Sequence, residues 1–140
     1  MRPRHVFTYG SLMFEPVWSR VVAGRYASHP ARLEGFARCR IRGQDYPAVT
    51  AAPGGLVDGL LYLDVDASDL ARLDAFEGDA YRREDVAVRL ADGGPPVPAG
   101  VYVWTNPSLL EPDPWDARHF ERERLHAFLI DYCGPRADKR

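Results

Sequence analysis

The sequence has few cysteines, no long apolar run and no large excess of charge of either sign. Its two cysteines, Cys39 and Cys133, are too few for a disulfide-stabilised scaffold, and their wide separation is not that of metal ligands. No apolar run approaches the ~20 residues that a membrane-spanning helix needs. The charged N-terminus is not followed by the apolar segment of a signal peptide. We therefore expect a cytoplasmic protein that does not associate with membranes.

The charge balance and the histidines limit the possible ligands. The 18 basic and 20 acidic residues leave a net charge of −2, which argues against a dedicated nucleic-acid-binding protein. His119 and His126 lie two turns apart on a predicted helix, and no third ligand is near them in the sequence. We expect neither a metal site nor a cofactor.

Apolar residues, in contrast, are abundant enough for a core, at 46% of the 140 residues. This length fits one domain over 1–140, in which the charged residues 136–140 form a tail. Residue patterns predict strands at 6–9, 37–42, 46–50, 56–65, 81–90 and 101–104, and helices at 16–24, at 69–77 and between 116 and 134. Because several strands follow one another without helices, we expect a mixed or antiparallel sheet, closed or partly closed into a small barrel.

Glycine and proline positions add detail to this outline. Pro53-Gly54-Gly55 predicts a turn between two strands, and Gly59 within the strand 56–65 predicts a bulge or a close backbone approach. The proline-rich stretch Thr105–Trp115 predicts a loop, and residues 27–35 are expected to form a loop that passes into a strand.

Capping residues mark the ends of two predicted helices. Asp66-Ala67-Ser68 offers N-cap residues for the helix 69–77, and Gly78 is typical of the position after a helix. Asp116 is expected to cap the last helix, and Gly134-Pro135 to stop it. The apolar stripe of this last helix consists of Leu125, Phe128, Leu129 and Tyr132.

The first predicted strand runs directly into a small-residue turn. Val6 to Tyr9 are β-branched or aromatic, and Gly10-Ser11 then interrupts the strand pattern. In such a turn several backbone N–H groups point the same way, and a nest of this kind binds anions, including carboxylates. The simpler interpretation is an ordinary strand end. Ser11 lacks the surrounding motif of a nucleophilic serine.

An acidic residue lies on the apolar side of the predicted helix 69–77. Leu70 and Leu73 form its apolar stripe, and Glu77 follows them at helical spacing, so Glu77 lies on the same inward face. Burial and the negative end of the helix dipole should raise its pKa, which suits proton transfer near neutral pH. The alternative is a structural ion pair of Glu77 with Arg82 or Arg83. Asp69 and Asp74 point elsewhere on the helix and are expected to be solvated.

The predicted strand 37–42 alternates strictly, with arginine at every second position. Arg38, Arg40 and Arg42 share one face, which is either a solvated outer surface or a cationic rim for a negatively charged ligand. Four tyrosines on or beside strands either line a cavity or belong to the core: Tyr9, Tyr62, Tyr81 and Tyr102.

Two motifs in this order resemble the γ-glutamylcyclotransferase-like superfamily, and most closely its AIG2-like branch. The first is Tyr9-Gly10-Ser11-Leu12, and the second is the stretch from Leu73 to Arg83, which contains Phe76-Glu77 and Tyr81-Arg82-Arg83. The resemblance covers the chain from Val6 to about Phe128. It includes further matching segments at 33–36, 46–49, 57–62 and 102–104.

This resemblance implies an α+β fold, with a small, mixed, mostly antiparallel β-barrel, flanking helices and a cavity at one end. It implies that the backbone amides of Tyr9, Gly10, Ser11 and Leu12 hold the α-carboxylate of a γ-glutamyl substrate. It further implies that Glu77 is the catalytic acid/base, and that Tyr81 and Arg83, or Arg82 in its place, orient Glu77 or the substrate.

The implied reaction releases 5-oxoproline from a γ-glutamyl amine or peptide by attack of the substrate's own α-amine. An intramolecular attack needs positioning more than an enzyme nucleophile. A hydrolase that uses water against the same amide is a second hypothesis. A third is a non-catalytic module that binds a small carboxylate and meets a protein partner through the arginine face. The leaving group and the oligomeric state stay open, and the loop Thr105–Trp115 is expected to border the cavity.

Overall fold

The computed structural model describes residues 4–133, except for the side chains of Pro107, Pro112, Tyr132 and Cys133. The tail expected at 136–140 and the helix stop expected at Gly134-Pro135 lie outside the described residues.

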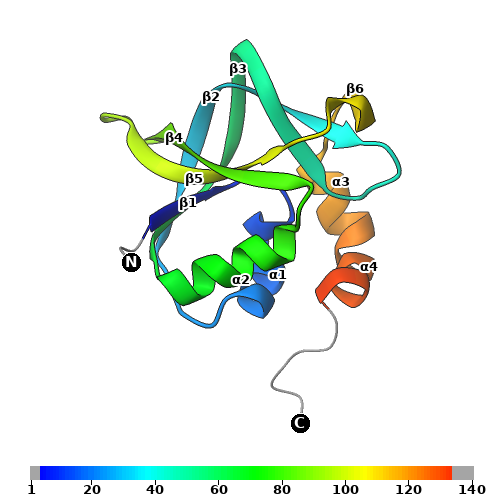
Figure 1. Cartoon of the computed structure of the whole chain (residues 1–140), viewed down its shortest axis with the longest axis horizontal. Coiled ribbons are helices and arrows are strands. Elements are labelled where there is room, and N and C mark those ends of the chain that lie inside the picture. Colours follow the sequence, from blue (N-terminus) through cyan, green and yellow to red (C-terminus); the bar gives the residue numbers. More distant parts are fainter. Residues whose placement is uncertain (1–3, 134–140) are drawn as a thin grey trace.

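A closed β-barrel forms the body of the protein (Figure 1). Its strands are β1 (Arg4–Thr8), β2 (Ser28–Ile41), β3 (Pro47–Val65), β4 (Tyr81–Leu90), β5 (Val97–Trp104) and β6 (Leu110–Pro114). They are ordered β3-β1-β5-β4-β2-β6, and a further pairing of β3 with β2 closes the barrel. β1 and β5 run parallel, whereas the other described pairs are antiparallel. The predicted small, mixed, mostly antiparallel barrel with flanking helices is confirmed.

Helices flank the barrel on one side in Figure 1. They are α1 (Glu15–Val21), α2 (Ala67–Glu77) and a C-terminal helix made of α3 (Ala117–His119), a π-helical segment (Phe120–Arg124), α4 (Leu125–Phe128) and a second π-helical segment (Leu129–Cys133). As predicted, Asp116 caps the C-terminal helix, because its Oδ1 accepts hydrogen bonds from the backbone N–H groups of Arg118 and His119.

The ends of α2 are fixed by the residues that the sequence indicated. The Asp66 carboxylate accepts a hydrogen bond from the backbone N–H of Asp69 over 2.8 Å, so the helix begins at Ala67. Gly78 follows the helix with φ +78° and ψ −173°, a conformation that is open almost only to glycine. Glu77 is therefore held as the last residue of the helix.

β2 and β3 are longer than predicted. The stretch expected to be a loop up to Gly35 belongs to β2, and the turn expected at Pro53-Gly54-Gly55 lies within β3. Gly35 has φ +85° and Gly54 has φ +82°, and the register between the two strands shifts next to Gly35. These glycines bend the strands without ending their pairing, because glycine adopts positive φ at little cost. A bend and a turn look alike in the sequence.

Two buried clusters result from the alternation of side chains along the strands. On β1, Val6 packs with residues of the helices, whereas its neighbour Phe7 packs with residues of the other strands. Phe120 and Phe128 bring the C-terminal helix into the first cluster. β1 thus lies between the two clusters, and the segment that follows it emerges where barrel and helices meet.

The expectation that Asp69 is solvated was wrong, since only 1% of the residue is exposed. Its carboxylate accepts hydrogen bonds from the backbone N–H groups of Ala23 (2.8 Å) and Gly24 (2.9 Å), from the hydroxyl of Tyr26 (2.6 Å) and from Arg72 (2.6 Å). Burial alone would raise the pKa of Asp69, but these hydrogen bonds outweigh it and lower the pKa to about 2. Three of these partners, Ala23, Gly24 and Tyr26, come from the segment after α1, and helix periodicity could not reveal that this segment packs over Asp69.

Gly59 is a point of close backbone approach, as the sequence predicted. A Cβ atom at this position would lie 2.1 Å from the carbonyl oxygen of Thr8 and 2.8 Å from Cζ of Phe7. β1 and β3 therefore reach their observed separation only because residue 59 has no side chain.

We expect Gly59→Ala to lower the free energy of unfolding by about 3 kcal/mol or more, because neither the Thr8 carbonyl nor the buried Phe7 ring can move away freely. Urea unfolding followed by circular dichroism measures this loss. Gly35→Ala is the matched control, since its positive φ costs only about 1–2 kcal/mol and no atom lies within 4 Å of the added Cβ. Equal losses in the two variants would contradict the steric argument.

Candidate active site

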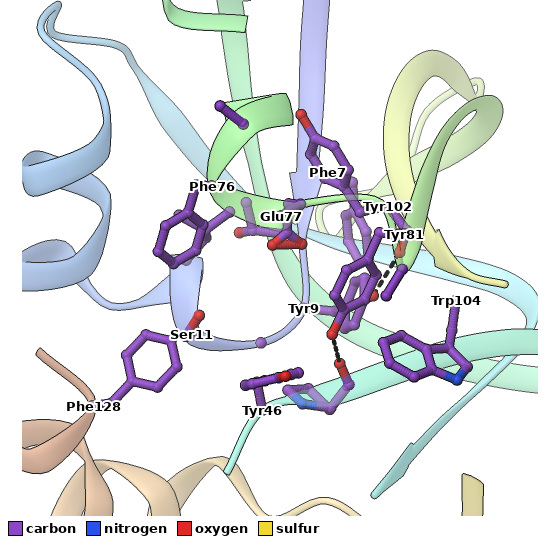
Figure 2. Close-up of a pocket in the computed structure, with 16 residues that line it drawn as sticks. Phe7, Tyr9, Ser11, Tyr46, Phe76, Glu77, Tyr81, Tyr102, Trp104 and Phe128 are labelled. Atoms are coloured by element: carbon purple, nitrogen blue, oxygen red, sulfur yellow. Dashed lines mark hydrogen bonds between the residues drawn. The ribbon is translucent and has the colours of Figure 1, made fainter. Parts of the chain in front are cut away.

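A cavity of about 310 Å³ lies where β1 and α2 end. This volume is near the lower end of the roughly 300–1,000 Å³ found for small-molecule sites. Figure 2 shows the Glu77 side chain in the middle of the cavity, surrounded by aromatic rings. The lining residues are Phe7, Thr8, Tyr9, Gly10, Ser11, Leu12, Tyr46, Pro47, Ala75, Phe76, Glu77, Ala80, Tyr81, Tyr102, Trp104 and Phe128.

The Glu77 carboxyl is the acidic group of this cavity. Burial raises its pKa to about 8, and the negative charge of Asp74 adds to the rise. The residue as a whole keeps a partial exposure to solvent, whereas its carboxyl is enclosed by protein atoms. The prediction of an inward-facing glutamate with a raised pKa is confirmed. Near neutral pH such a group can both accept and donate a proton.

The alternative of a structural ion pair between Glu77 and Arg82 or Arg83 was wrong. Arg82 pairs with Glu84, and the Arg83 guanidinium pairs with Asp74. Arg83 was expected to orient Glu77 or the substrate, but its side chain is not among those that line the cavity.

The turn after β1 presents backbone to the cavity. Ser11–Met13 form one turn of 3-10 helix, closed by hydrogen bonds from the Met13 N–H to the Gly10 carbonyl (3.0 Å) and from the Phe14 N–H to the Ser11 carbonyl (3.1 Å). The N–H groups of Ser11 and Leu12 belong to the first turn and have no acceptor within this helix. Two donors of the predicted nest thus lie in residues that line the cavity.

Arg38 supports this turn from outside the cavity. Its Nη1 donates a hydrogen bond to the Tyr9 carbonyl oxygen over 2.9 Å, and its guanidinium carbon lies 5.4 Å from the ring centre of Trp115. Neither predicted role of this residue, a solvated face or a cationic rim, describes that position. The alternation of residues correctly predicts that Arg38 lies on the opposite face of the strand from its apolar neighbours. It does not show that the turn after β1 packs against this face.

Hydrogen bonds fix three of the lining tyrosines. The hydroxyl of Tyr9 donates to the Tyr102 carbonyl (2.5 Å), that of Tyr81 to the Pro47 carbonyl (2.7 Å), and that of Tyr102 to Oδ1 of Asp74 (2.7 Å). Burial raises the pKa of all three phenols, so they stay uncharged at neutral pH. Tyr62 lies elsewhere and stacks on Trp18 at 3.6 Å between ring centres.

Several aromatic residues of the site were not predicted from the sequence. Tyr46 and Trp104 lie within segments that match the family pattern, which is the signal that points to them. Phe128 belongs to the predicted apolar stripe of the last helix, but the stripe does not show which part meets the cavity. The segment 105–115 was expected to border the cavity, yet none of its described side chains does, because β6 pairs with β2 instead.

Over residues 4–133, no three metal-binding side chains of His, Cys, Asp or Glu come together. In the same part of the chain, no helix is both long and apolar enough to cross a membrane.

A cavity that contains an enclosed carboxyl of raised pKa beside a glycine turn can accommodate a small molecule and exchange a proton with it. The family model described as "Gamma-glutamyl cyclotransferase, AIG2-like" matches residues 6–122. The chain therefore belongs to the AIG2-like γ-glutamyl cyclotransferase family.

Individual relatives agree with this assignment. The Arabidopsis thaliana protein named "Protein AIG2 C" is 35% identical over 103 residues, which are 73% of this chain and 62% of that protein. This chain thus spans about three fifths of that relative's length. A solution structure of an Arabidopsis thaliana protein has a TM-score of 0.71 and 26% identity, and covers 92% of this chain and 87% of its own. A structure named "Gamma-glutamyl cyclotransferase" has a TM-score of 0.64 and 22% identity, and the match covers 77% of this chain and 68% of that chain. This match shows the shared fold.

The raised pKa of Glu77 makes stability depend on pH. In the unfolded chain this carboxyl ionises near its ordinary pKa of 4.5, whereas in the folded protein it ionises near 8. The folded state therefore binds the additional proton between these values, and its stability falls as the pH rises through that window.

We expect Glu77→Gln to match the wild type in stability near pH 4 and to exceed it by about 2 kcal/mol at pH 9, because glutamine has no charge to bury. Urea unfolding at both pH values measures the difference. Glu121→Gln, at an exposed position, serves as the control. Its difference in stability from the wild type should be the same at both pH values. A Glu77→Gln variant with equal advantage at both pH values would disprove the desolvation argument.

Proposed function

We propose that the protein is a γ-glutamyl cyclotransferase that releases 5-oxoproline from a γ-glutamyl amine or peptide. The observation that carries this proposal is the Glu77 carboxyl, whose pKa is raised to about 8 inside a cavity that also contains the Tyr9–Leu12 turn. A module that only binds a ligand has no need of a carboxyl held out of water at an energetic cost. Membership of the family supports the same reaction.

In the proposed reaction, the α-amine nitrogen of the substrate attacks the γ-glutamyl carbonyl carbon. A new C–N bond closes the ring, and the C–N bond to the leaving amine breaks. The Glu77 carboxylate takes a proton from the attacking nitrogen, and the resulting carboxylic acid gives that proton to the leaving nitrogen. No water is consumed, and Glu77 returns to its starting state.

The raised pKa suits both halves of this transfer. A base with a pKa near 8 takes a proton from an amine at a lower cost than an ordinary carboxylate does, and its acid form still releases the proton readily. Activity should therefore rise with pH as Glu77 loses its own proton.

The turn after β1 supplies the proposed grip on the substrate. Backbone N–H groups of Ser11 and Leu12, together with the small residue Gly10, would hold the α-carboxylate, as donors at the start of a helical turn do for anions. Tyr81, fixed by its hydrogen bond to Pro47, would border the γ-glutamyl group. Holding both ends of one molecule brings its amine and carbonyl together, and this positioning replaces a protein nucleophile.

We expect the wild type to release 5-oxoproline from at least one member of a panel of γ-glutamyl amino acids, γ-glutamyl amines and glutathione, and Glu77→Gln to lose at least about 100-fold in rate. Mass spectrometry detects the product, and circular dichroism checks that the variant is folded. Glu84→Gln, which lies on β4 and is not among the lining residues, is the matched control. Full activity of Glu77→Gln would defeat the proposed role. Free glutamate as the product would indicate a hydrolase, and binding without any product would indicate a binding module.

We expect Gly10→Ala to raise KM roughly tenfold or more, because the added Cβ would lie 2.8 Å from the Pro47 ring and displace the turn. Ser11→Ala should change KM much less, because the proposed contacts come from the backbone and not from the hydroxyl. Steady-state kinetics with the best substrate of the panel separates the two variants. A larger effect of Ser11→Ala than of Gly10→Ala would assign the carboxylate contact to the side chain.

A further inference from the structure

We propose that Asp74 and Arg83 act together as positioning residues, whose opposite charges set how readily Glu77 gives up its proton. Asp74 lies on α2 one turn before Glu77, and Arg83 lies on the neighbouring strand β4. This inference rests on the proposed role of Glu77, but its test does not depend on that role alone.

The geometry shows an ordered pair and not a chance surface contact. The Arg83 guanidinium meets Asp74 with two parallel hydrogen bonds, Nε to Oδ1 at 2.8 Å and Nη2 to Oδ2 at 3.1 Å. Oδ1 also accepts the hydroxyl of Tyr102 over 2.7 Å. Asp74 therefore joins α2, β4 and β5, three elements that all contribute residues to the cavity.

Asp74 also fixes the end of the helix that carries Glu77. Its backbone carbonyl accepts a hydrogen bond from the Gly78 N–H over 3.0 Å, directly after Glu77. The Arg83 side chain is only one quarter exposed, against 43% for the Asp74 side chain, so the pair is partly shielded from solvent. Shielding of this kind strengthens an electrostatic effect on a buried neighbour.

Among the described residues that line the cavity, the titratable groups other than Glu77 are phenols. Tyr9 follows β1, Tyr46 precedes β3, Tyr81 lies on β4 and Tyr102 on β5, and all four line the cavity. Burial raises the pKa of Tyr9, Tyr81 and Tyr102, which therefore carry no charge at neutral pH.

Among the described residues, Asp74 supplies the charge that raises the pKa of Glu77 beyond the effect of burial. Arg83, held against Asp74, neutralises part of that charge. The two residues therefore shift the titration of Glu77 in opposite directions. A pair that served folding alone would not produce such opposite shifts.

We expect Asp74→Asn to lower the titration midpoint of Glu77 by about half a pH unit, and Arg83→Gln to raise it by a similar amount. Asp74→Asn removes the negative charge beside Glu77. Arg83→Gln leaves that charge without its positive partner. Arg83→Lys keeps the positive charge and should leave the midpoint close to that of the wild type. Carbon-13 NMR of labelled glutamate carboxyls measures the midpoint without substrate, and Glu77→Gln identifies the signal.

The pH dependence of kcat/KM should move in the same directions as the titration midpoints. Arg82→Gln and Asp92→Asn carry the same charge changes at exposed positions and are the matched controls, with no expected shift. Midpoints that do not move, or that move in the same direction in Asp74→Asn and Arg83→Gln, would overturn the inference. If Asp74→Asn fails to fold, Arg83→Gln against Arg83→Lys decides the question. A wild type that forms no 5-oxoproline would defeat the proposed function, whereas the substrate-free titration would still decide this inference.

Discussion

A carboxyl group held out of water at the end of α2 is the constraint on which the rest of the site depends. Glu77 is kept there by the glycine-specific conformation of Gly78 on one side and by the buried Leu70 and Leu73 on the other. Burial of an ionisable group costs stability, so the surrounding core must outweigh that cost. The pKa near 8 follows from this position and not from any unusual property of the residue.

The barrel places the proposed substrate-binding turn in the same cavity as this carboxyl. β1 runs between the two buried clusters, so the turn that follows it must emerge at the junction of barrel and helices. Arg38 on β2 donates a hydrogen bond to the Tyr9 carbonyl from outside the cavity, and the Pro47 ring lies against Gly10 in the cavity wall. A rigid strand, a long hairpin and a helix end thus converge on one small cavity, which is how a site obtains precision without flexible loops.

Most elements follow from local rules. The end of α2 was predicted correctly because Gly78 is a helix stop, whereas the helix begins at Ala67, two residues before the predicted start at 69. β4 was predicted at its observed limits. Glu77 was recognisable because helical spacing relates it directly to Leu73. The bends at Gly35 and Gly54 were not recognisable from the sequence, since a glycine in a bent strand and a glycine in a turn have the same local signature. Similarly, nothing local shows that Asp69 is buried under the segment after α1.

The sequence by itself therefore determined the fold class, the position of Glu77 on an apolar face and the presence of a backbone turn after the first strand. The last two depend on residues close together in the chain, whereas the fold class follows from the order of the predicted elements and from the resemblance carried by two motifs. Only the tertiary structure decided that Arg83 pairs with Asp74 and does not line the cavity, and that Arg38 supports the turn. It also decided that the cavity walls include Tyr46, Trp104 and Phe128. These are contacts between distant segments. Their partners are set by barrel closure and by the packing of the helices against it, which residue spacing along the chain does not encode.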